Sequence, residues 1–140
     1  MNAAPDWLRS YLKIPYAEAN CGRLVGRVLR EQAGLEVPWL YNELDRVEDA
    51  RWLEEGQPRT EAIVADELAS GSWSKVETPE RFDVALYSVD GGWHVGVVID
   101  PAWGLITTKS HGSHPYRLRM WLWAQNLEGY YRYVSRARSS

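Results

Sequence analysis

The chain has 140 residues, a net charge of −3 at pH 7 and one cysteine. This length fits a single domain over residues 1–140, and the charge argues against a nucleic-acid binder that works through bulk positive charge. One cysteine rules out an intramolecular disulfide framework and a cysteine-based zinc site. No stretch approaches the roughly 18 uninterrupted apolar residues of a membrane span, and residues 1–6 lack a signal-peptide pattern. We therefore expect no membrane insertion, no bound metal and no cofactor.

The first half of the chain has helical patterns. Helical periodicity predicts three helices, over residues 5–12, 21–34 and 60–69. Asp6 and Thr60 are good N-cap residues for the first and third, and Gly34 is a natural C-terminal residue for the second. Acidic and basic residues alternate over residues 44–53, which we interpret as a loop or a marginal helix on a solvated face.

From about residue 80 onward, β-branched and aromatic residues predominate. Four strands are predicted, over residues 82–89, 93–99, 103–108 and 129–134. The glycine pair at 91 and 92 is typical of a hairpin between the first two strands. Helices followed by hairpin-linked strands favour an α+β domain, with the helices packed on one side of an antiparallel sheet.

Cys21 lies where a nucleophile would be expected, at the start of the second predicted helix. Asn20 is a suitable N-cap, and the free amides of a helix start favour an anion, so a thiol there should have a lowered pKa. The alternative is that a lone cysteine serves only as a small buried apolar residue. Cys21 shares the inward edge of Leu24 and Val25, which fits both interpretations.

His94 opens a predicted strand directly after the glycine pair. Gly96, two residues later, lets another chain segment or a ligand approach closely. A thiol on a helix start and an imidazole on a sheet are the parts of a thiol–imidazole pair, in which the imidazole takes the thiol proton and the thiolate attacks a carbonyl. Asp100 lies too far along an extended strand to reach the same ring, so a Cys-His-Asp triad is disfavoured.

Four strings of residues, in this order, resemble the NlpC-type cell-wall cysteine peptidases, a papain-like family. They read Cys-Gly-Arg-Leu-Val from Cys21, Arg-Phe-Asp-Val from Arg81, His-Val-Gly-Val-Val from His94, and Gly-Tyr-Tyr-Arg from Gly129. In the family, the first holds the nucleophile, the second takes the form Pro-Gly-Asp-Val, the third opens on the catalytic histidine, and the fourth is a closing strand of phage versions. The resemblance spans nearly the whole chain and is closest to the compact enzymes of tailed phages. A permuted family with Asn-Cys after its histidine is disfavoured, because cysteine comes first here.

This resemblance implies a papain-like α+β fold and a cysteine peptidase or amidase that cleaves peptidoglycan stem peptides. Cys21 would be the nucleophile and His94 the general base. The residue that orients the imidazole, usually His, Asn or Gln in the family, falls on Thr107 here, with His111 as the alternative.

Two further residues are expected near the substrate. Tyr16 would add a hydroxyl to the oxyanion hole formed by the backbone amide of Cys21. Trp93 adjoins the catalytic histidine and is the tryptophan most favoured for the substrate cleft; the others are expected mainly in packing. His111 and His114 lack nearby carboxylates or thiols, so a polar loop is favoured there over a metal site.

The implied substrate lies outside the cytoplasm, and the resemblance implies a carrier, namely the tail of a virion or of a tail-like particle. There the enzyme would open the wall locally during DNA delivery, with tail-tip proteins as partners. Residues 121–123 and 133–140 are candidate docking segments. A competing interpretation keeps the same fold as a catalytically eroded structural protein of the tail tip.

Overall fold

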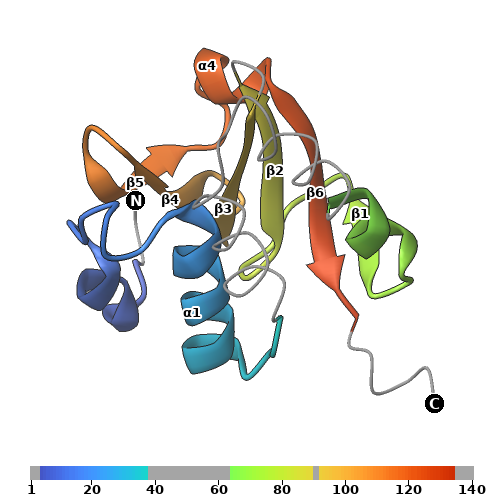
Figure 1. Cartoon of the computed structure of the whole chain (residues 1–140), viewed down its shortest axis with the longest axis horizontal. Coiled ribbons are helices and arrows are strands. Elements are labelled where there is room, and N and C mark those ends of the chain that lie inside the picture. Colours follow the sequence, from blue (N-terminus) through green and yellow to red (C-terminus); the bar gives the residue numbers. More distant parts are fainter. Residues whose placement is uncertain (1–3, 38–63, 90–91, 135–140) are drawn as a thin grey trace.

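The computed structural model describes residues 4–37, 64–89 and 92–134. Six strands form one antiparallel sheet in the order β1-β6-β2-β3-β4-β5, which confirms the predicted α+β class (Figure 1). Residues 64–69 are also helical, whereas Thr60 and residues 44–53 lie outside the described part. The elements are the 3-10 helix η1 (Asp6–Tyr11), α1 (Cys21–Ala33), β1 (Trp73–Val76), β2 (Val84–Val89), β3 (Gly92–Asp100), β4 (Trp103–Thr108), β5 (Gly112–Arg117), α4 (Trp121–Ala124) and β6 (Leu127–Tyr133).

The ends of α1 are fixed as the sequence predicts. The Asn20 side chain accepts a hydrogen bond of 2.8 Å from the backbone amide of Arg23, which satisfies one free donor at the helix start. Gly34 follows the helix with φ of 68°, in the left-handed region that glycine tolerates. The apolar stripe of α1 is fully buried and consists of Leu24, Val25, Val28 and Leu29.

The sheet carries a hydrophobic cluster on each face. On one face, α1 packs against β3 and β4, and its stripe joins Val95, Val97 and Ile99 in a single cluster. Leu8 and Tyr11 of η1 and Val64 belong to the same cluster, so the N-terminal helices share one side of the sheet. The short helix α4 packs on the opposite face. The second cluster contains Ala85, Tyr87, Val98, Ile106, Tyr116, Leu118 and Trp123.

Tyr116 packs in the second cluster because two glycines leave room for its ring. A Cβ atom on Gly96 would lie 2.6 Å from the Tyr116 hydroxyl, and one on Gly104 would lie 2.6 Å from the ring itself. The close approach predicted at Gly96 is therefore made by this side chain. The Tyr116 hydroxyl lies 2.6 Å from that of Tyr87, and the pair shares one hydrogen bond inside the cluster.

This tyrosine pair should make the protein sensitive to alkaline pH. Burial is the main cause that raises the pKa of both Tyr87 and Tyr116 above the ordinary value of 10.0. The folded state therefore holds protons that the unfolded chain releases near pH 10, so stability is present below that pH and falls above it. We expect the melting temperature to decline from pH 9 to 11, and to decline less in the double variant Tyr87→Phe/Tyr116→Phe. An equal decline in both proteins would contradict this explanation.

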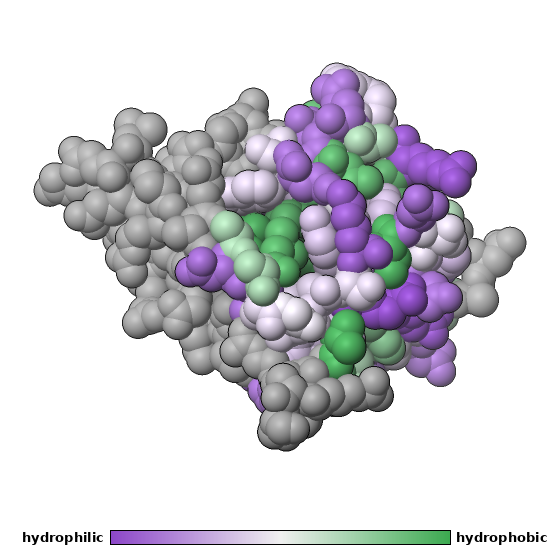
Figure 2. All heavy atoms as spheres, turned by 90° about the vertical axis from the view of Figure 1, so that its right-hand side faces the viewer, coloured by the Kyte–Doolittle hydropathy of each residue, from purple (hydrophilic) through white to green (hydrophobic). Residues whose placement is uncertain are grey.

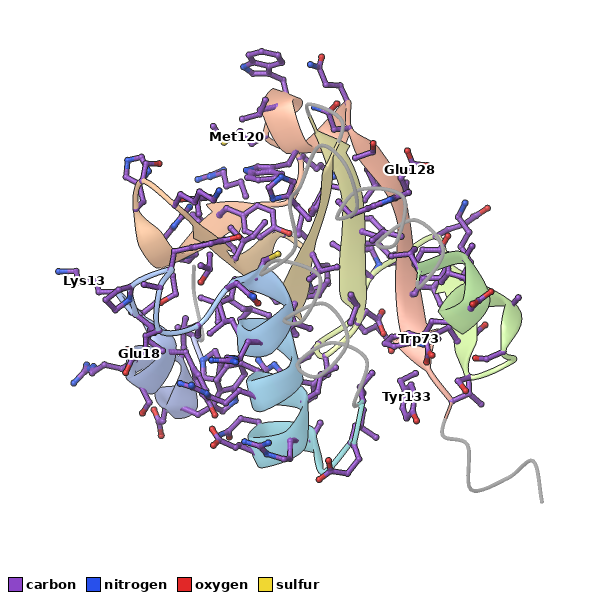
Figure 3. All side chains as sticks on the ribbon, viewed as in Figure 1. Lys13, Glu18, Trp73, Met120, Glu128 and Tyr133 are labelled. Carbon is purple, nitrogen blue, oxygen red and sulfur yellow. The ribbon has the colours of Figure 1, made fainter. Side chains whose placement is uncertain are left out.

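Both edges of the sheet carry features that block further strand pairing. Ser74 and Lys75 of β1 are exposed at one edge, and β5 at the other contains Pro115, which has no amide to donate. Figure 2 shows the side formed by β1 and β6, where hydrophilic residues cover much of the described surface. The rings of Trp73 and Tyr133 pack edge to face at 5.1 Å where these two strands meet (Figure 3).

Two strands were not predicted from the sequence. The polar-loop prediction for the segment with His111 and His114 is wrong from Gly112 onward, because residues 112–117 form β5. Ser113 explains the difference: its amide donates to the Ile14 carbonyl at 2.9 Å, and its hydroxyl accepts from the Ile14 amide at 2.7 Å. These long-range bonds hold the strand although it contains a proline. The four-residue strand β1 is the other omission.

Candidate functional site

Cys21 is the first residue of α1 and is 8% exposed. It belongs to the cluster on the α1 face of the sheet, beside Leu24 and Val25. It forms no disulfide. The structure thus places the thiol at a capped helix start, where backbone amides without helical partners favour a negative charge.

His94 lies near the beginning of β3, opposite Tyr87 of β2 in the sheet register. Its ring contacts Trp123 of α4, with centroids 6.3 Å apart and planes inclined at 68°. Strand alternation and this contact place the half-buried imidazole on the face of the second cluster. Trp123 is thus an aromatic neighbour of the His94 ring.

The elements that carry Cys21 and His94 contact each other at one end of the molecule. α1 packs against β3, and its N-terminal end points toward the end of the molecule that carries α4 (Figure 1). β2 follows β3 as far as Gly92, whereas the β3–β4 ladder ends at Val97 and Leu105. The backbone pairing between β3 and β4 therefore does not extend to His94.

The predicted hydrogen bond from Thr107 to the catalytic imidazole is not formed. Thr107 is fully buried and pairs with Ser113 in the sheet register, but its hydroxyl has no hydrogen-bond partner in the described part of the chain. His111, the alternative, is exposed, and its Nδ1 lies 2.8 Å from the Ser110 hydroxyl. Neither residue is seen to orient the ring of His94.

Trp93 and Tyr16, the two residues expected near the substrate, are both half-buried. Trp93 is half-buried and packs against the cluster on the α1 face, because it alternates with His94 along β3. Tyr16 is half-buried, and the Lys109 ammonium lies 5.7 Å from the centre of its ring. Trp123 was expected only within the candidate docking segment 121–123, and no local pattern marks its contact with His94.

An open groove of about 1020 Å³ lies next to this site, between the β4–β5 hairpin and α4. Trp123 lines the groove and also contacts His94, so it connects the two. Thr108 at the end of β4 and Tyr116 of β5 contribute to the same lining. The groove has room for an extended ligand, and Trp123 separates that ligand from the ring of His94 by one side chain.

Other chemical assignments find less support in the geometry. Asp100 accepts hydrogen bonds from the amides of Ala102 and Trp103, at 2.8 and 2.9 Å, and so shapes the turn before β4. The rings of His111 and His114 lie 5.9 Å apart. Within the described ranges, no group of three or more His, Cys, Asp or Glu residues is arranged to hold a metal ion.

Comparison with known proteins adds no evidence about the function of these residues. The chain matches no family model, and a search of curated proteins finds no relative. Among the described residues, no helix is long and apolar enough to cross a membrane.

Proposed function

We propose that the protein is a cysteine peptidase or amidase of the papain-like NlpC type, with Cys21 as nucleophile and His94 as general base. The observation that carries the proposal is the contact between α1 and β3, the two elements that carry Cys21 and His94. We propose that thiol and imidazole meet beside the first residues of β3, where this strand is not paired with β4.

The chemistry needs only residues of this chain and water. His94 takes the thiol proton, and the thiolate attacks a peptide carbonyl, with the backbone amide of Cys21 and the Tyr16 hydroxyl donating to the oxyanion. The protonated imidazole then gives its proton to the leaving amine, which departs and leaves an acyl-enzyme. Water, deprotonated by the same imidazole, attacks this thioester and releases the acid and the free thiol.

A backbone feature supports the resemblance to the NlpC type. Phe82 has φ of 72°, in the region that normally favours glycine, and it stands where the family string has its glycine. The following Asp83 is 1% exposed and accepts two hydrogen bonds of 2.9 Å from Arg132 of the closing strand. Two of the four strings, from Arg81 and from Gly129, are thereby joined by an ion pair whose carboxylate is buried.

The proposed substrate is the stem peptide of peptidoglycan, and the proposed setting is the tail of a phage or of a tail-like particle, where the enzyme opens the wall locally during DNA delivery. The resemblance to phage versions is the basis for this setting. The exposed apolar residues of α4 and its start are compatible with docking on tail-tip proteins: Met120, Trp121 and Leu122 are 48, 69 and 37% exposed. Proteomics of purified particles would test it; detection only in host lysate would overturn it.

One observation favours a second candidate function. Because the Thr107 hydroxyl has no partner and His94 lacks this orienting bond, the same fold could serve as a catalytically eroded structural protein of the tail tip. The two candidates differ in whether the purified protein hydrolyses its substrate.

Digestion of purified sacculi distinguishes these candidates. We expect the protein to release soluble fragments whose masses correspond to cleavage of an amide bond within the stem peptide, with one new amine for each new carboxylate. The reaction should require no added metal and should stop on treatment with iodoacetamide. Release of no fragments from sacculi of several cross-link types would favour the eroded structural protein instead.

A further inference from the structure

The groove beside the candidate site is positively charged, although the chain as a whole is acidic. The chain has 19 Asp and Glu against 16 Lys and Arg, yet no carboxylate of the described residues lines the groove. Three cationic side chains line it, from Lys13, Arg117 and Arg119, together with His111 and His114. This local reversal of charge is the feature that indicates a ligand.

The cations of the groove are available to a ligand. All three are exposed, and none of them forms a salt bridge with any described residue. The Arg117 guanidinium lies over the ring of Trp103, 5.0 Å from its centre, so this charge is held in place without being neutralised. A guanidinium held in this way can donate two parallel hydrogen bonds to a carboxylate.

Lys13 is fixed at the groove by the chain around it. Its amide donates to the Ser113 carbonyl at 2.8 Å, and its φ of 61° is unusual for a residue other than glycine. Ile14, the next residue, packs closely against the start of β5, because a Cβ atom on Gly112 would lie 2.6 Å from the Ile14 carbonyl oxygen. Figure 3 shows Lys13 and Met120 on opposite sides of the β4–β5 hairpin, as expected for the two ends of an extended lining.

Part of the remaining lining of the groove is apolar. Met120, Leu122 and Trp123 contribute to it, and Trp123 also contacts the ring of His94. A ligand of this groove should therefore carry negative charge along one part and apolar groups along another, and should extend toward the imidazole.

We propose that the groove binds an acidic peptide, with Arg117, Arg119 and Lys13 binding its carboxylates and the Trp123 side contacting its apolar groups. The inference rests on the proposed function in one respect, namely that a peptide held there would be the substrate whose carbonyl reaches Cys21. The groove would select peptides that carry a carboxylate near the cleaved bond.

Binding of a labelled hexaglutamate peptide, followed by fluorescence anisotropy at low salt, tests the proposal. The Cys21→Ala protein is used, so that binding is measured without turnover. We expect hexaglutamate to bind and hexaglutamine to bind much more weakly. The double variant Arg117→Gln/Arg119→Gln should weaken hexaglutamate binding by roughly tenfold or more. Lys75→Gln, which removes an exposed charge on β1 at the opposite edge of the sheet, should leave it unchanged.

Three results would overturn the groove assignment: equal binding of hexaglutamate and hexaglutamine, unchanged binding in the double variant, or binding of inorganic polyphosphate in place of hexaglutamate. The assay also separates this inference from the proposed function. Groove-dependent binding by a protein that leaves sacculi intact would support the acidic-peptide site while contradicting the peptidase. Sacculus cleavage without hexaglutamate binding would support the peptidase and contradict the acidic-peptide site.

Discussion

Replacing Cys21 by alanine should abolish stem-peptide cleavage and leave the fold intact. No other cysteine is present to take over the nucleophilic role, so the loss should be roughly a thousandfold or more. The side chain is small and lies at the edge of the cluster on the α1 face, beside Leu24 and Val25. The melting temperature should therefore stay within a few degrees of the wild-type value. Fragment release from sacculi, quantified by mass spectrometry, measures the activity.

Cys21→Ser provides the matched control for this prediction. Serine keeps the size and the hydrogen-bonding capacity of the side chain but is a much weaker nucleophile than a thiolate at neutral pH. It should be as inactive as alanine and as stable as the wild type. Cleavage that survives in either variant at more than a few per cent of the wild-type rate would place the nucleophile elsewhere.

The second large effect is expected at His94. Glutamine preserves much of the size and polarity of the side chain but cannot accept and return a proton at neutral pH, so His94→Gln should lower the cleavage rate by roughly a hundredfold to ten-thousandfold. The contact with Trp123 is of aromatic type, so a small loss of stability is also expected. Initial rates measured with equal amounts of folded protein separate the two effects.

Trp123→Phe is the companion variant for His94→Gln. Phenylalanine keeps an aromatic ring beside His94 and in the second cluster, so a reduction in rate much smaller than that of His94→Gln is expected. If both variants lowered the rate equally, His94 would be acting through packing and not through proton transfer.

Those parts of the fold that depend on local pattern were predicted from the sequence. The periodic stripe after Cys21, with Asn20 before it and Gly34 after it, determined α1 because caps and apolar spacing agree there. β4 has the predicted bounds, Trp103–Thr108, because β-branched residues fill a strand with neighbours on both sides.

The remaining parts depend on contacts between distant residues. β5 contains Pro115 and His114, and it is a strand because it pairs with β4 and because Ser113 bonds the segment at Tyr11 and Ile14. No window of the sequence contains both partners of such bonds. Edge strands also tolerate residues that a central strand excludes, so composition alone indicates a loop.

In the candidate site, too, the features that depend on local pattern were predicted and those that depend on distant contacts were not. The sequence identified Cys21 on a helix start and His94 on a strand, since both follow from local pattern. It did not identify Trp123 as the neighbour of His94, and it assigned to Thr107 a hydrogen bond that the structure does not contain. The positively charged groove was also not predicted, because its cations come from separate parts of the chain: Lys13, Arg117 at the end of β5, and Arg119 after it.

The most direct test of the central claim is the pH dependence of alkylation of the Cys21 thiol. If Cys21 and His94 form a thiol–imidazole pair at a helix start, the iodoacetamide reaction in the folded protein should show an apparent pKa well below the free-thiol value of about 8.5. This low value should rise in His94→Gln. A thiol that reacts only above about pH 8.5, with the same profile in both proteins, would contradict the pair and leave Cys21 as a buried apolar residue.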